Sequence, residues 1–185
     1  MSYLLEIGYT DVILLAILSY VVYHFFFKKP PTVEVVVEPE LPKIEMMDLT
    51  VEEMKKYNGV DDPHIFVGVA GRIFDVTRGK DYYGPEGVYS NFAGHDGTRA
   101  FATFDMKAVK DEYDDISDLN SSDLSDALEW EERLRMKYPF VGRLLAPGDK
   151  PRDYNGEKAT IQWGTLGRLD IEEGKFVERP VKAAE

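Results

Sequence analysis

A glycine-rich stretch from Tyr82 to Phe104, YYGPEGVYSNFAGHDGTRAFATF, holds the side chains of this chain that are best suited to binding chemistry. Its glycines and proline break it too often for a long helix or a regular strand. A phenol has a pKa of about 10, so it becomes an anionic oxygen ligand only beside a strong cation such as ferric iron. Without such a cation, a tyrosine in a loop is an amphipathic core residue with its hydroxyl at the surface. Both interpretations stay open on these residues alone.

Other metal-binding residue types are scarce. The chain has no cysteine, which excludes disulfides, thiolate metal sites and cysteine nucleophiles. Its three histidines are His24 in an apolar N-terminal run, His64 at the start of an expected strand, and His95 in the glycine-rich stretch. The sequence shows no Ser-His-Asp spacing, no H-E-x-x-H and no phosphate-binding loop motif. We therefore expect a protein that is not an independent enzyme.

Length and charge narrow the class of protein further. The 185 residues are 44% hydrophobic, which predicts one domain with a sizeable core, an anchor and a tail. There are 22 Lys and Arg residues against 34 Asp and Glu residues, a formal net charge of -12. Nucleic-acid binding needs clustered cations to neutralise phosphates, so DNA and RNA are not expected partners.

The N-terminus predicts a single membrane span. Residues 12–27 read VILLAILSYVVYHFFF, with only Ser19 and His24 as polar interruptions. Acidic residues precede the run and no small-x-small cleavage site follows it, which favours a retained anchor over a signal peptide. Lys28 and Lys29 follow directly, so the positive-inside rule predicts a cytosolic body, with the endoplasmic reticulum, another endomembrane or the plasma membrane as its location.

Behind the anchor, turn and capping signals mark a compact domain. A helix is expected over 48–59, with Thr50 as N-cap and Glu53 completing a capping box. Strands are expected over 64–70 and 72–77 with the turn at Ala70-Gly71. Short helices are expected over 89–93 and 98–104, the second capped by Asp96 or Thr98, followed by a solvated acidic loop, a helix from Asn120 to Pro139 and a strand over 140–145. Tyr113 in that loop is a solvated tyrosine, a kinase substrate or part of a sorting signal.

The expected organisation has four parts. These are a transmembrane anchor (1–29), a Pro/Glu-rich linker (30–43) in which residues 33–37 could form an edge strand, a domain (44–146) and a polar C-terminal tail (147–185) that could dock through Trp163.

The order helix, two strands, glycine loop with short helices, long helix and strand resembles the cytochrome b5-like domain, an α+β fold. The blocks FDVTRGKDYYGPEGVYSNFAGHDGTRAFATFD, AVKDEYDDISDL and KYPFVGRLL are similar to those of the membrane-associated progesterone receptor component family, over roughly residues 44–145. The resemblance implies that the loop holds a haem b with ferric iron. A cytochrome b5 clamps iron with two histidines, one in an H-P-G-G turn, but this chain has Tyr83, Gly84, Pro85, Glu86 and Gly87 there.

The resemblance also implies which residues form the haem site. The axial ligand in this family is a tyrosine, which falls on Tyr89 here, and Tyr83, Lys137 and Tyr138 match residues that hydrogen-bond around the pocket. A phenolate is a hard ligand that stabilises Fe(III), so a low reduction potential and one open iron face are expected. Phe92, Phe101 and Phe104 are expected in the core instead of the cofactor wall.

The family implies a membrane-tethered, haem-binding regulator of cytochrome P450 enzymes or membrane receptors. Steroid and sterol metabolism, haem handling and receptor trafficking, including neuronal guidance, are the implied roles. A haem-dependent homodimer is a further hypothesis. Two alternatives stay open: a sterol- or steroid-binding module without haem, and an electron-transfer protein like cytochrome b5, which the missing histidine pair disfavours.

Overall fold

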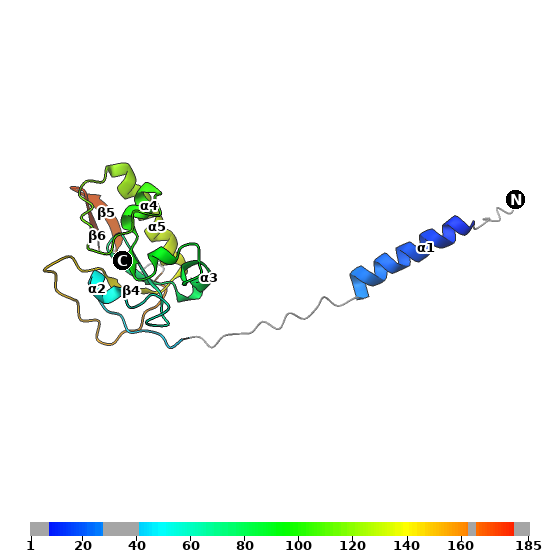
Figure 1. Ribbon diagram of the computed structural model, residues 1–185, viewed down its shortest axis with the longest axis horizontal. Helices are drawn as coiled ribbons and strands as arrows, with labels where there is room; N and C mark the ends of the chain where they lie inside the picture. Colours follow the sequence, from blue (N-terminus) through cyan, green and yellow to red (C-terminus); the bar gives the residue numbers. More distant parts are fainter. Residues whose placement is uncertain (1–7, 28–40, 163–165, 180–185) are drawn as a thin grey trace, which may run out of the picture. The chain divides into compact units, whose positions relative to one another are not determined.

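The computed structural model describes residues 8–27, 41–162 and 166–179 (Figure 1). Contacts divide the chain into two units, Met1–Glu40 and Leu41–Glu185. Most of the expected linker, including residues 33–37, and Trp163 lie outside the described residues.

The N-terminal unit is helical where it is described. Helix α1 spans Tyr9–Val22 and continues as a π-helical turn, η1, over Tyr23–Phe27. The amide of Gly8 donates to the carboxylate of Asp11 at the helix start. The 19 residues from Tyr9 to Phe27 are long and apolar enough to cross a membrane by length and composition.

A four-stranded sheet with the order β3-β1-β2-β4 forms the centre of the second unit. Strands β1 (Phe66–Val69) and β2 (Arg72–Asp75) form an antiparallel hairpin, as expected. Ala70 and Gly71 both have positive φ, 49° and 72°, which is the type I′ conformation that suits a two-residue turn. The short strand β3 (His95–Asp96) pairs parallel with β1, and β4 (Phe140–Arg143) pairs antiparallel with β2.

The first helix of this unit is shorter than expected. Helix α2 covers only Val51–Met54, although the capping box is formed: the amide of Thr50 donates to Glu53 at 2.9 Å and the Thr50 hydroxyl accepts from the Glu53 amide. The chain then leaves the helix because the Tyr57 carbonyl oxygen accepts from the Phe66 amide, at the start of β1. This pairing to the sheet replaces the next helical turns.

Short helical turns surround the glycine-rich loop. They are η2 (Thr77–Gly79), α3 (Lys80–Tyr83), η3 (Ser90–Phe92) and α4 (Thr98–Thr103). The Asp96 carboxylate accepts hydrogen bonds from the amide and hydroxyl of Thr98. The N-cap of α4 is nevertheless Gly97, which makes no side-chain capping bond, so the expected cap at Asp96 or Thr98 is wrong. Phe92 and Phe101 stack at 4.7 Å between centroids in the core, as expected. Phe104 is 68% exposed in a left-handed conformation, so its expected core position is wrong.

The long helix α5 spans Ser121–Lys137, close to the expected bounds. The Asn120 side-chain oxygen accepts from the amides of Ser122 and Asp123 at 2.8 and 3.0 Å. The acidic loop before it is not simply solvated, because Asp114 is 7% exposed and pairs with Arg99.

The C-terminal segment is more ordered than a polar tail. Strands β5 (Arg168–Glu172) and β6 (Lys175–Arg179) form a second, two-stranded sheet, and β5 packs against α5 (Figure 1). Ala159 and Leu166 are 4% and 8% exposed and belong to the main core. Ala159 and Leu166 therefore contribute to the core, although they follow no periodic pattern in the sequence.

Candidate functional site

Three tyrosines from three separate segments meet beside the glycine-rich loop. The ring of Tyr83, at the end of α3, lies 5.9 Å from that of Tyr89 and 6.2 Å from that of Tyr138 between centroids. Tyr138 is the C-cap of α5. The tertiary fold thus brings together the tyrosines that the family resemblance had pointed to, and we call them the tyrosine cluster.

Tyr83 is the inner member of the tyrosine cluster. It is 8% exposed, and burial, followed by the nearby hydroxyls of Tyr138 and Tyr89, raises its pKa to about 12. A phenol in that environment keeps its proton at neutral pH and can donate a hydrogen bond. It is suited to support a neighbouring anion instead of becoming one.

Tyr89 is the accessible member. It is 38% exposed, and its neighbour Val88 is 77% exposed. Its amide donates to the Tyr82 carbonyl oxygen at 2.8 Å, which closes the turn that presents the side chain. Gly87 makes this turn possible, because a Cβ there would lie 2.1 Å from the same carbonyl oxygen. The phenol is therefore reachable from solvent on a backbone that is held in place.

Tyr138 and Lys137 enter the site from the end of α5. Tyr138 is 3% exposed, and its hydroxyl reaches Gly79, where a Cβ would lie 2.7 Å away. Lys137 is exposed, with its Nζ 5.1 Å from the centre of the Tyr138 ring. Gly79 was not singled out from the sequence. The signal that could have found it is a glycine directly before KDYY, where a tyrosine-rich segment needs room for close packing.

The two histidines of the second unit already have partners at both ring nitrogens. His64 contacts Asp62 at 2.9 Å through Nδ1 and the Pro42 carbonyl oxygen at 3.3 Å through Nε2. His95 contacts the Ala93 carbonyl oxygen at 2.8 Å and Asp111 at 3.1 Å. Within residues 8–27, 41–162 and 166–179, no group of three or more His, Asp or Glu side chains is placed to hold a metal ion. A two-histidine clamp would have to break these contacts.

The residue types around Tyr89 fit haem b. A porphyrin needs an anionic or neutral donor for iron, an apolar surface for its ring and cations for its propionates. Tyr89 offers the donor, the exposed side chains of Tyr82 and Val88 offer apolar surface, and Lys137 offers a cation. A separate cleft of about 610 Å³ lies on the flank of the same turn, lined by Val88, Ser90, Asn91, His95, Met106, Lys107, Val109 and Asp111.

Residues 50–145, more than half of the chain, match the family model of the cytochrome b5-like haem/steroid-binding domain. The chain belongs to this family. The order and pairing of its elements around the tyrosine cluster are thus a cytochrome b5-like α+β fold, as the sequence predicted.

Several known proteins are similar to this chain over 116 to 123 residues. Membrane-associated progesterone receptor component 2 of Rattus norvegicus is 45% identical over 122 residues, covering 65% of this chain and 56% of that protein. Protein vem-1 of Caenorhabditis elegans is 44% identical over 123 residues, covering 66% and 67%. The cytochrome P450 regulator dap1 of Schizosaccharomyces pombe is 40% identical over 116 residues, covering 60% and 69%. The similarity that the sequence blocks indicated is confirmed, and the match spans about half the length of the rat protein.

One solved structure, a protein from Arabidopsis thaliana described as having a cytochrome b5 like fold, is 33% identical. The comparison covers 59% of this chain and all of that one, with a TM-score of 0.48.

Proposed function

We propose that this protein is a membrane-tethered regulator whose body binds ferric haem b through the Tyr89 phenolate. The observation that carries the proposal is the tyrosine cluster: one exposed phenol on a braced turn, next to two buried phenols. When bound, haem would supply a ferric centre that favours the deprotonated form of a phenol. The family's description, a haem/steroid-binding domain, supports the choice of ligand.

In this proposal the other site residues have supporting roles. The Tyr83 hydroxyl, which keeps its proton, and the Tyr138 hydroxyl donate hydrogen bonds toward the ligand oxygen or the propionates. Lys137 pairs with a propionate, since it is exposed and free to turn from the Tyr138 ring. Gly79 and Gly87 leave room for Tyr138 and the Tyr89 turn.

The N-terminal helix and the relatives' names support the rest of the role. The helix over Tyr9–Phe27 would anchor the chain in the endoplasmic reticulum or another membrane, with the body in the cytosol. Relatives are named as a receptor component and as a cytochrome P450 regulator, so we propose P450 enzymes or membrane receptors as partners. Effects on steroid metabolism, haem handling or receptor trafficking would follow from the activity of those partners, and this protein would catalyse no reaction itself.

The Tyr89→Phe variant tests the ligand directly. The full chain in detergent is titrated with ferric haem, and the ultraviolet-visible spectrum is recorded. We expect a tyrosinate-to-iron charge-transfer band in the wild type, its loss in Tyr89→Phe and at least about tenfold weaker binding, because the ring stays but the donor oxygen is gone. Tyr82→Phe is the matched control and should keep the band. A Tyr89→Phe spectrum identical to that of the wild type would remove Tyr89 as the ligand.

A second function is a steroid-binding module that does not need haem. The cleft of about 610 Å³ on the flank of the Tyr89 turn is of ligand size, and Val88, Met106 and Val109 give it an apolar part for a steroid ring. Wild-type protein that binds a steroid but shows no haem spectrum would support this function over the first.

A further inference from the structure

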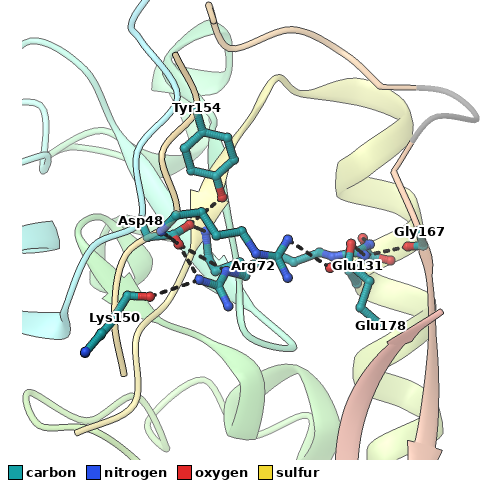
Figure 2. Close-up of polar contacts among 9 residues, drawn as sticks. Asp48, Arg72, Glu131, Lys150, Tyr154, Gly167 and Glu178 are labelled. Carbon is teal, nitrogen blue, oxygen red and sulfur yellow. Dashed lines mark hydrogen bonds and ion pairs between the residues drawn. The ribbon is translucent and has the colours of Figure 1, made fainter. Parts of the chain in front are cut away.

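The C-terminal hairpin β5–β6 lies beyond residues 50–145, the segment matched by the family model, and one buried arginine ties it to that segment. Arg72 on β2 is 3% exposed. Its guanidinium donates to Glu131 on α5 at 2.8 Å, to the Gly167 carbonyl oxygen at 2.5 Å and to Glu178 on β6 at 3.0 Å. Figure 2 shows these three acceptors grouped around the end of the Arg72 side chain. We call this group the Arg72 latch; it joins sheet, helix and hairpin.

The Arg72 latch is balanced by further charges. Glu178 also accepts from Arg152 at 3.2 Å, and Glu131 lies 3.6 Å from Nε of Arg135. A buried charge is tolerated only when its partners satisfy it. The loss of one carboxylate therefore leaves the Arg72 guanidinium poorly compensated and weakens its hydrogen bonds to the remaining acceptors. The hairpin therefore depends on the latch for its position.

Helix α5 connects the Arg72 latch to the tyrosine cluster. Glu131 lies seven residues before Tyr138, which is roughly 10 Å along the helix. The helix ends with the hydrogen bond from the Tyr138 amide to the Leu134 carbonyl oxygen, and the Tyr138 ring then meets Tyr83 edge to face. The hairpin adds a second restraint, because β5 packs against α5. Whatever fixes the axis of α5 also fixes where Tyr138 and Lys137 lie.

We propose that Arg72 and the C-terminal hairpin position α5 so that Tyr138 and Lys137 face the haem-binding loop. Arg72 is thus a positioning residue that acts through Glu131 and the helix. The consequence for haem rests on the proposed function, whereas the positioning of α5 can be measured without haem.

Hydrogen–deuterium exchange of the full chain in detergent, combined with haem titration of the same samples, tests the proposal. Glu178→Gln removes one charge of the latch and keeps the side chain's size. Glu172→Gln is the matched control, because Glu172 pairs with Arg179 on the surface of the same hairpin. We expect Glu178→Gln to raise exchange in the last turn of α5 at least about fivefold and to weaken haem binding by a similar factor. The tyrosinate band should keep its position, because Tyr89 is untouched.

The outcomes separate the two proposals. Unchanged exchange at the end of α5 in Glu178→Gln overturns the positioning role, as does an equal rise in the β1–β2 hairpin, which would mean general loosening. The positioning role is also overturned if Glu172→Gln raises exchange at the end of α5 as much as Glu178→Gln does. Arg72→Met should raise exchange at the end of α5 more than Glu178→Gln does. If the Arg72→Met protein does not fold, the Glu178→Gln result decides the test alone. Wild-type protein without a haem spectrum overturns the proposed function, and the exchange result still decides the role of the latch.

Discussion

Tyr83, Tyr89 and Tyr138 are the same residue type in three different environments. Tyr89 is 38% exposed, whereas Tyr83 and Tyr138 are 8% and 3% exposed. Burial disfavours a charged phenolate, so the buried pair is suited to donate hydrogen bonds and the exposed residue to meet an external cation. The proposed division of roles at the site therefore follows from solvent access.

The raised pKa of Tyr83 predicts a loss of stability at high pH. Its pKa is about 12 in the folded protein against about 10 unfolded, so between these values only the unfolded state loses the proton. Stability is unaffected below pH 10 and then falls by up to about 1.4 kcal/mol per pH unit as pH rises toward 12.

Urea unfolding of wild type and Tyr83→Phe at pH 8, 10 and 11 measures this loss, and the stability of wild type relative to Tyr83→Phe should fall as pH rises above 10. Tyr154→Phe is measured for comparison. Burial and then the Asp48 contact raise the pKa of Tyr154 to about 12 as well, so the stability difference from wild type should change with pH in the same direction. A difference between wild type and Tyr83→Phe that is constant with pH would contradict the assignment.

At the scale of elements, side-chain caps mark the start of α2 and α5, whereas η2, α3, η3 and α4 have no side-chain cap. Helix α2 has four residues, and α5 starts with two amides held by the Asn120 side chain. An isolated helix of four residues is unstable in water, so packing of Val51 and Met54 in the core supplies most of the stability of α2. The caps therefore set where α2 and α5 begin, and core packing decides whether α2 forms.

Replacing the α5 cap tests this division. Asn120→Ala leaves the first amides of α5 without an acceptor, and we expect the free energy of unfolding to fall by about 1 kcal/mol. Urea denaturation followed by far-ultraviolet circular dichroism gives the value. Ser121→Ala, one residue later on the exposed surface, is the control and should change stability by less than about 0.5 kcal/mol. Equal effects of the two changes would refute the capping role.

At the scale of the whole molecule, residues beyond the matched family segment belong to the body. Asp48, 7% exposed, receives hydrogen bonds from Arg143 and from the Tyr154 hydroxyl. Figure 2 shows the Tyr154 hydroxyl directed at Asp48. Although burial alone would raise it, these bonds keep the pKa of Asp48 below its usual value. Together with the Arg72 latch, this pairing attaches the C-terminal segment at two buried polar points.

The proposed cytosolic orientation of the second unit can be tested at Asn120. Asn120-Ser121-Ser122 is an N-x-S glycosylation acceptor, and Asn120 is exposed. A cytosolic body never meets the luminal transferase, so translation with microsomes should give a product without an endoglycosidase-sensitive mobility shift. Ser122→Ala destroys the acceptor and is the matched control. A shift in wild type that Ser122→Ala abolishes would place the body in the lumen and reverse the orientation.

The sequence by itself determined the features that depend on local chemistry. Turn residues at Ala70-Gly71, caps at Thr50 and Asn120, and the apolar run at the N-terminus each act over a few neighbours, so their signals are complete within the chain. The family blocks added the fold and the candidate tyrosines.

Only the tertiary structure decided which phenol is exposed, where α2 ends, that Phe104 faces solvent and that the C-terminal segment forms a hairpin. Arg72 illustrates the reason. Its partners Glu131, Gly167 and Glu178 are 59, 95 and 106 residues away along the chain, and no local pattern carries a contact over such separations. Burial and long-range pairing arise only when distant segments share one core, so they cannot be read from periodicity or caps.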